Sequence, residues 1–197
     1  MRALATLTLV VLLAGCSKKQ PAETPPPPPP PVQAPDADNA PAFERTVTAD
    51  GIQARVHVPH GQAASEGTFV VEIEFDAGAH YESTHDRDGD VIDVWLADVT
   101  GDTHPDLVVT TSSSGSGGYG SAFVFQNHGE AWLARPASDL AEDQQSGYMG
   151  HDTFVIENGA LLRRFPLYRE GDPNAAPSGG IAAYAYDFAA DRWTKRP

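Results

Sequence analysis

The 197-residue sequence has a single cysteine, Cys16, so no intramolecular disulfide bond can form. The apolar run at residues 3–12 is about half of the roughly 20 residues that a transmembrane helix requires. Common catalytic patterns are also missing: there is no Gly-x-Ser-x-Gly, no His-Glu-x-x-His and no Gly-x-x-x-x-Gly-Lys-Ser. We therefore expect a protein that is not an enzyme, and a hydrolase with dispersed catalytic residues is the weakest alternative.

Basic residues are scarce. The chain has 13 Lys and Arg against 27 Asp and Glu, which gives a net charge of −14 at pH 7. Nucleic acids and anionic membrane surfaces repel such a protein, so we expect neither as a partner, whereas a cationic protein is attracted by long-range steering. A requirement for solubility alone also accounts for the charge.

The first residues have the pattern of a bacterial lipoprotein signal. Arg2 precedes the apolar run, and Leu13-Ala14-Gly15-Cys16 matches the lipobox at each position. We predict that residues 1–15 are a signal peptide, that Cys16 is lipidated, and that this lipid is the chain's only contact with a membrane. Because Ser17 rather than Asp follows the cysteine, the pattern indicates the outer membrane, facing the periplasm or the cell surface.

Residues 16–42 are predicted to be a disordered, proline-rich linker. Ten of the 17 prolines lie between Ser17 and Pro41, and residues 25–31 are all proline. A seven-proline run adopts an extended polyproline II helix and spans about 20 Å. This linker holds the following residues, 43–197, away from the lipid, and they have the length of a single domain.

Alternation of apolar and polar residues dominates this domain. Phe69, Val71 and Ile73 share one face of a predicted strand, with Glu72 and Glu74 on the other. Asn158-Gly159 is a strong hairpin signal. We predict an all-β fold, an antiparallel β-sandwich or barrel-like domain of about nine short strands, with one short helix at residues 137–145. The predicted strands cover residues 52–58, 69–75, 91–96, 107–111, 122–126, 131–134, 153–156, 160–164 and 181–188.

An acidic segment offers a candidate metal site. Asp98, Asp102 and Asp106 recur with the spacing by which a tight loop wraps Ca²⁺, although Thr100 replaces an acid and the loop is not repeated. A hairpin turn whose carboxylates accept backbone hydrogen bonds is the competing interpretation, and it is the one we favour. The calcium interpretation corresponds to a Ca²⁺-dependent surface-binding or adhesion module, and otherwise no cofactor is expected.

Residues 112–120 are serine or glycine at every position except Tyr119. A flexible linker has no need of a large aromatic residue, and a tight turn has no need of nine residues. One interpretation is a protruding loop whose aromatic side chain anchors in a partner's cleft. The other is a mobile hairpin loop with Tyr119 folded back onto the sheet.

The sequence resembles the periplasmic inhibitors of invertebrate-type (I-type) lysozyme. The resemblance is carried by Arg87-Asp88-Gly89, by residues 94–102 and 105–109, and by Ser114-Gly115-Ser116-Gly117-Gly118-Tyr119, with weaker agreement over residues 67–75. It implies a β-sandwich that places Ser116-Gly117-Gly118-Tyr119 in the active-site cleft of I-type lysozyme and so protects peptidoglycan. Gly118 stands where the family commonly has serine, which leaves Ser114 as a rival contact. The part of the chain after Asn158 has no role in this resemblance, and the sequence leaves open whether the chain forms a homodimer.

Overall fold

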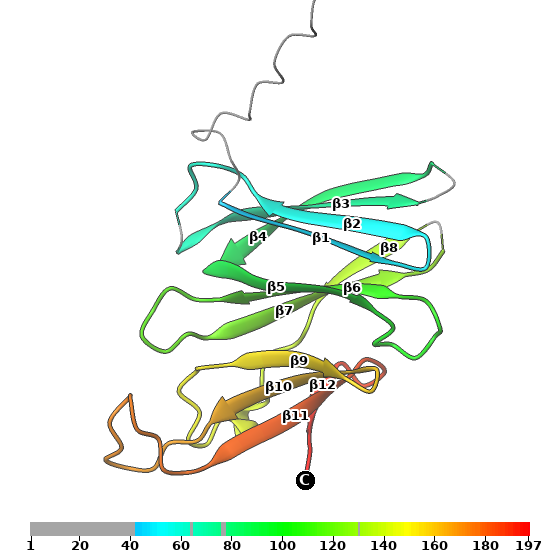
Figure 1. Cartoon of the computed structure of the whole chain (residues 1–197). Helices are drawn as coiled ribbons and strands as arrows, with labels where there is room; N and C mark the ends of the chain where they lie inside the picture. The colour runs from blue at the N-terminus through cyan, green and yellow to red at the C-terminus, as the bar shows by residue number, and fades with distance from the viewer. Residues whose placement is uncertain (1–41, 64, 76–77, 130) are drawn as a thin grey trace, which may run out of the picture. The chain divides into compact units, whose positions relative to one another are not determined.

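The chain folds almost entirely into β-strands. The computed structural model describes residues 42–197, except for residues 64, 76–77 and 130, and in this part of the chain it has twelve strands in three antiparallel sheets (Figure 1). The prediction of an all-β, antiparallel fold is confirmed. The structure extends it by a third layer, which the sequence did not indicate.

The first sheet is a meander of four strands in sequence order: β1 (Phe43–Ala49), β2 (Ile52–Val58), β3 (Glu66–Phe75) and β4 (His80–Asp88). Asp50 and Gly51 join β1 to β2 with φ angles of 49° and 74°. Two consecutive positive φ angles are the requirement of a type I′ turn, which Asp-Gly adopts readily. The short turn thus fixes the register in which Ala49 pairs with Ile52.

The second sheet packs on the first. Its strands are again in sequence order: β5 (Asp90–Ala97), β6 (Asp106–Ser112), β7 (Gly120–Asn127) and β8 (Trp132–Pro136). The residues between the two sheets form one apolar core, which includes Phe69, Ile73, Leu107 and Phe125. These eight strands are the β-sandwich that the alternating pattern predicts.

The third sheet covers the other face of the second sheet. Its strands are β9 (Thr153–Glu157), β10 (Ala160–Pro166), β11 (Ile181–Asp187) and β12 (Arg192–Lys195), in the spatial order β12-β11-β10-β9. A second core, which includes Val108, Val124, Leu161, Phe165 and Trp193, fills the space between these layers. The second sheet is therefore the middle layer of three (Figure 1).

Strand β6 is buried on both faces. Leu107 and Val109 belong to the first core, Val108 belongs to the second, and all three side chains are fully buried. A strand covered on both sides has no need of alternation, which explains why three apolar residues follow one another here. This strand carries the loop that the sequence singled out.

Three strands were missing from the prediction of about nine: β1, β4 and β12. Strand β4 has the sequence HYESTHDRD and lies at the edge of its sheet, with mostly exposed side chains. An edge strand of this kind has no apolar period to detect. Strand β12 has only four residues, too few for alternation to be distinguished from chance.

The predicted helix at residues 137–145 is wrong. Only Glu142–Gln144 form a helical turn, and it is of the 3-10 type. The backbone before it is used in tertiary contacts, because Ala137 donates its amide to the Ala122 carbonyl at 2.8 Å and Trp193 donates its indole N–H to the Ser138 carbonyl at 2.7 Å. These hydrogen bonds replace the ones that a helix would make.

His85 predicts a pH dependence of stability. Its ring lies 5.4 Å from that of Phe69 and 4.8 Å from that of Phe125, and burial lowers its pKa from the ordinary 6.5, against the opposing charge of Asp86. The unfolded chain therefore takes up this proton at a higher pH than the folded chain does, so stability is lost as pH falls below 6.5. We expect urea unfolding between pH 7.5 and 5.5 to show a smaller pH slope for His85→Phe than for the parent. Parallel curves would contradict this.

Candidate functional site

The Ser/Gly/Tyr segment forms a loop at the end of a central hairpin. Strands β6 and β7 are the inner strands of the second sheet, and residues 113–119 connect them, hereafter loop 113–119. The base of the loop is closed by a hydrogen bond of 2.8 Å from the Ser113 amide to the Tyr119 carbonyl. The loop therefore stands on a doubly covered strand rather than on a sheet edge.

Hydrogen bonds within the loop give it a defined shape. Tyr119 donates its amide to the Ser113 hydroxyl at 3.0 Å, and Gly118 donates to the Gly115 carbonyl at 3.1 Å. Gly118 has a φ of +51°, a conformation in which a residue with a side chain is strained. Glycine therefore suits this backbone better than a residue with a side chain would.

The predicted contact residues lie at the surface. The side chains of Ser114 and Ser116 are exposed, Gly117 and Gly118 are half-buried, and Tyr119 is 50% exposed. The ring of Tyr119 contacts the ring of Tyr148. It stands edge-on to Tyr148 at 5.6 Å, and Tyr148 in turn packs on Phe165 at 4.7 Å.

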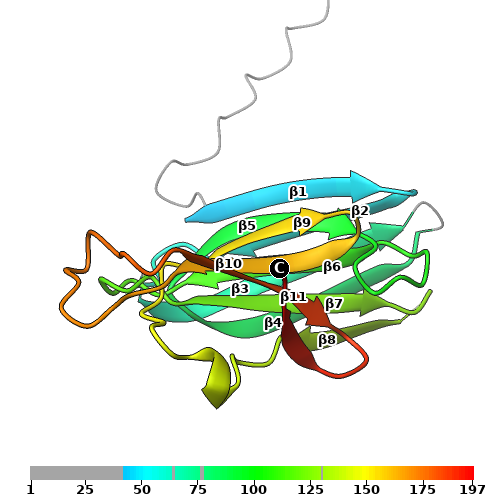
Figure 2. The same ribbon diagram turned by 90° about the horizontal axis from the view of Figure 1, so that it is seen from below.

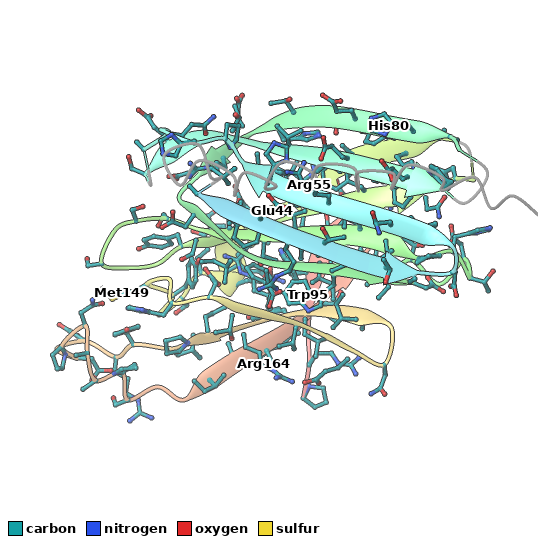
Figure 3. All side chains as sticks on the ribbon, turned by 45° about the horizontal axis from the view of Figure 1, so that its top comes forward. Glu44, Arg55, His80, Trp95, Met149 and Arg164 are labelled. Carbon is teal, nitrogen blue, oxygen red and sulfur yellow. The ribbon has the colours of Figure 1, made fainter. Side chains whose placement is uncertain are left out.

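The loop is also contacted by residues that the sequence did not predict and that all follow Arg135; these include Tyr148, Met149, His151, Asp152 and Asn174. Met149 is 43% exposed and lies at the end of the molecule to which the loops between β6 and β7 and between β10 and β11 extend (Figures 2 and 3). Glycines at positions 147 and 150 flank Tyr148 and Met149, and both have positive φ. This pair of glycines was the feature of the sequence that could have indicated a segment with an unusual backbone conformation.

A buried ionic network lies beneath the loop. The Asp152 carboxylate accepts hydrogen bonds from Arg163 Nε at 2.7 Å and Nη2 at 3.1 Å, from the Tyr148 hydroxyl, and from the Gly120 amide at 2.8 Å. The side chains of Asp152 and Arg163 are 0% and 6% exposed. Burial, and then the hydrogen bond to Asp152, raises the pKa of the Tyr148 hydroxyl, which therefore remains a donor.

The acidic segment forms a hairpin turn between β5 and β6. Asp98 accepts hydrogen bonds from the amides of Gly101 at 2.7 Å and Thr103 at 3.0 Å, and Asp102 accepts one from the His104 amide at 2.9 Å. These are the backbone contacts that the turn interpretation predicts. In the described part of the chain, no three His, Cys, Asp or Glu side chains gather in a metal-binding group.

Asp106, the third calcium candidate, is fully buried, and its carboxylate stabilises the same turn by hydrogen bonds. It accepts hydrogen bonds from the amides of Val99 at 3.1 Å, Thr100 at 3.2 Å and Asn127 at 3.1 Å, and from the Thr100 hydroxyl at 3.1 Å. Burial raises the pKa of Asp106, while these hydrogen bonds act in the opposite direction. Calcium binding by the three aspartates stays a prediction.

The predicted lipidation site, Cys16, and the predicted linker lie outside the described residues. Within residues 42–197, leaving aside the gaps given above, no helix has the length and apolarity needed to cross a membrane. The boundaries proposed for signal peptide, linker and domain stay predictions.

The fold and the loop are those of an all-β protein that presents, at one end of a sandwich, a hydrogen-bonded loop with a half-exposed tyrosine where the loop joins β7. Residues 44–135 match the family model described as periplasmic lysozyme inhibitor of I-type lysozyme. Through these residues, which span nearly all of β1 to β8, the chain is similar to the periplasmic inhibitors of I-type lysozyme. The matching family consists of periplasmic inhibitor proteins, so the predictions of the family, of a protein that is not an enzyme and, at this coarse level, of a periplasmic location are confirmed. Lipid anchoring and location at the outer membrane stay predictions.

Two solved structures are similar to the chain. PliI-Ah, the periplasmic lysozyme inhibitor of I-type lysozyme from Aeromonas hydrophila, shares 29% identity over 51% of this chain and 92% of its own, with a TM-score of 0.46. The A. hydrophila inhibitor in complex with Meretrix lusoria lysozyme shares 27% identity over 48% of this chain and 85% of its own, with a TM-score of 0.43. No curated protein matches the chain.

Proposed function

We propose that this protein inhibits I-type lysozyme by inserting loop 113–119 into the active-site cleft of the enzyme, and that it thereby protects peptidoglycan. The observation that carries the proposal is the exposed, hydrogen-bonded loop at the end of the β6–β7 hairpin, inside the residues that match the inhibitor family. The A. hydrophila member of this family forms a complex with Meretrix lusoria lysozyme, which supports a lysozyme as the partner here.

The chemistry of the loop suits a glycosidase cleft. Lysozymes cleave peptidoglycan with two carboxyl groups, one a proton donor and the other an anion, that flank the glycosidic bond. The hydroxyls of Ser116 and Tyr119 are exposed and can donate hydrogen bonds to those carboxyl groups. They would occupy the positions of substrate and water without presenting a bond to be cleaved, and Ser114 offers an additional hydroxyl.

The charge of residues 44–135, hereafter the family region, favours rapid encounter with a cationic enzyme. From Glu44 to Arg135 the sequence has 15 Asp and Glu but only 4 Lys and Arg. Complementary charge raises association rates more than it raises affinity. The acidic surface would therefore help the loop to reach a cationic lysozyme before that enzyme reaches the cell wall.

The predicted lipid anchor fits this role. Lipidation at Cys16, with the proline-rich linker behind it, would hold the inhibitor beside the peptidoglycan layer on the outer membrane. Confinement of this kind raises the local concentration of inhibitor without any new contact. Radiolabelled palmitate incorporation, absent in Cys16→Ser, would establish the anchor.

A direct assay tests the function. We expect the chain from Ser17 onward to slow peptidoglycan hydrolysis by an I-type lysozyme at submicromolar concentration, and to act more weakly on chicken-type and goose-type enzymes. The double variant Ser116→Ala with Tyr119→Ala should lose most of this inhibition, because both proposed donors are removed. The proposal fails if no lysozyme is slowed at micromolar inhibitor. Loop insertion fails if the double variant inhibits as well as the parent.

A further inference from the structure

Loop 113–119 is contacted along its backbone by residues that lie beyond the family region. The Gly117 carbonyl accepts a hydrogen bond from the His151 amide, and the Gly118 carbonyl accepts one from the Asp152 amide at 3.3 Å. Asn174 donates its side-chain amide to the Ser116 carbonyl at 3.1 Å, and its side-chain oxygen lies 3.3 Å from His151 Nε2. Three consecutive carbonyls of the loop thus have partners in the third-layer part of the chain.

Asp152 also fixes the point at which the loop enters β7. Its carboxylate accepts the Gly120 amide at 2.8 Å and is itself held by Arg163 at 2.7 Å. A side chain at Gly120 would stand 2.6 Å from the Phe154 ring and 2.7 Å from Asp152 Cβ. The end of the loop is therefore packed directly against the buried ion pair and β9.

The close approach of the two backbones depends on glycine. A Cβ atom at Gly150 would lie 2.1 Å from the Gly117 carbonyl oxygen, a distance that two such atoms cannot adopt. Gly150 is buried and has a φ of +86°. The backbone of residues 148–152 can therefore pack this closely against the loop only because position 150 has no side chain.

We infer that residues 148–152 and Asn174, hereafter the brace, hold loop 113–119 in its lysozyme-binding conformation, with Gly150 and Asp152 as positioning residues. This inference rests on the proposed function for its consequence, because a loop already in the bound conformation loses less entropy on binding. The side chains of Ser114 and Ser116 stay exposed and that of Tyr119 stays half-exposed, because the brace holds mainly the backbone of the loop; its ring contact with the loop is that of Tyr148 with Tyr119.

The test compares two glycine substitutions. Gly150 and Gly171 have the same φ of +86°, but a Cβ at Gly171 would meet nothing within 4 Å. Both alanine variants place a Cβ atom on a backbone with the same positive φ, whereas only Gly150→Ala pushes on the loop. If the loop then occupies the binding conformation about a tenth of the time, the apparent affinity for lysozyme falls about tenfold. Gly171→Ala should inhibit like the parent.

Hydrogen exchange provides a readout that does not depend on inhibition. We expect the amides of Gly118, Tyr119 and Gly120 to exchange several-fold faster in Gly150→Ala than in Gly171→Ala. The surface variant Asn174→Ala removes the side-chain contacts with Ser116 and His151 and leaves the core intact, so it should shift both readouts less but in the same direction.

The outcomes separate the two proposals. A parent protein that slows no lysozyme overturns the proposed function, while loop exchange still decides whether the brace exists. The brace is overturned if loop exchange in Gly150→Ala and Asn174→Ala equals that in Gly171→Ala. If exchange rises but inhibition is unchanged, the brace does not position the loop for lysozyme, and the inference is equally overturned.

Discussion

Tyr119→Ala is expected to weaken inhibition of I-type lysozyme about 30-fold or more. The Tyr119 side chain is 50% exposed in the free protein and is the one large aromatic residue in loop 113–119, so it has most to gain from burial in a cleft. Aromatic anchors at the centre of an interface typically contribute about 2 kcal/mol or more, which is about 30-fold in affinity. The inhibition constant, measured at fixed salt, is the quantity to compare.

Leu133→Ala is the matched control. Leu133 is also 50% exposed, but it lies on β8 opposite Gln126, about 20 Å along the strand from the loop end of β7. This variant should inhibit lysozyme as strongly as the parent does. Tyr119→Phe separates the ring from its hydroxyl: it should retain the apolar contact and lose only the hydrogen bond. Equal inhibition constants for Tyr119→Ala and Leu133→Ala would remove Tyr119 from the interface.

Arg163→Met is expected to destabilise the protein by about 3–5 kcal/mol. The substitution keeps much of the apolar stem, but it leaves the Asp152 carboxylate, which is 0% exposed, without its cation. It also removes a guanidinium that lies 5.3 to 6.0 Å from the rings of Tyr148, Phe154, Phe165 and Trp193. Urea unfolding followed by circular dichroism would show the loss as a lower midpoint.

The neighbouring arginine provides the control for this prediction. Arg164 forms an ion pair with Glu157 at 2.7 Å, but both side chains are well exposed, at 37% and 47%. Exposed pairs contribute at most about 1 kcal/mol, so Arg164→Met should change the midpoint little. Adding Asp152→Asn to Arg163→Met should recover part of the lost stability, because it removes the unpaired buried charge. Similar midpoints for Arg163→Met and Arg164→Met would show that the buried pair is not a major source of stability.

The sequence predicted the sandwich because strand alternation and turn signals depend only on residues that are close together in the chain. Ile52, Ala54 and Val56 alternate with polar residues on one strand, and Asn158-Gly159 carries its turn in two residues. Nothing local distinguishes a strand that faces a second sheet from one that faces a third. The consecutive apolar residues of β6 are consistent with a strand that is covered on both faces. A short buried strand in a two-layer protein can have the same sequence pattern, so the third layer could not be predicted from it.

The sequence predicted loop 113–119 but not the residues that contact its backbone, and the reason is physical. Tyr119 is conspicuous because it stands among serines and glycines, and its exposure agrees with that composition. Asp152 and Asn174 act across sequence separations of 32 and 58 residues, through one carboxylate and one side-chain amide. Such contacts leave no periodicity in the sequence. Only the glycines at 147 and 150 marked the segment in which they lie.

The double coverage of β6 has a consequence for any attempt to shorten this protein. Val108, Ala122 and Val124 face the third sheet and are at most 2% exposed, so a fragment that ended at Arg135 would present them to water as a contiguous oily face. Surfaces of that kind cause proteins to associate with one another. The first two sheets therefore depend on the third sheet to cover this face. A shortened version without β9 to β12 would need polar substitutions there.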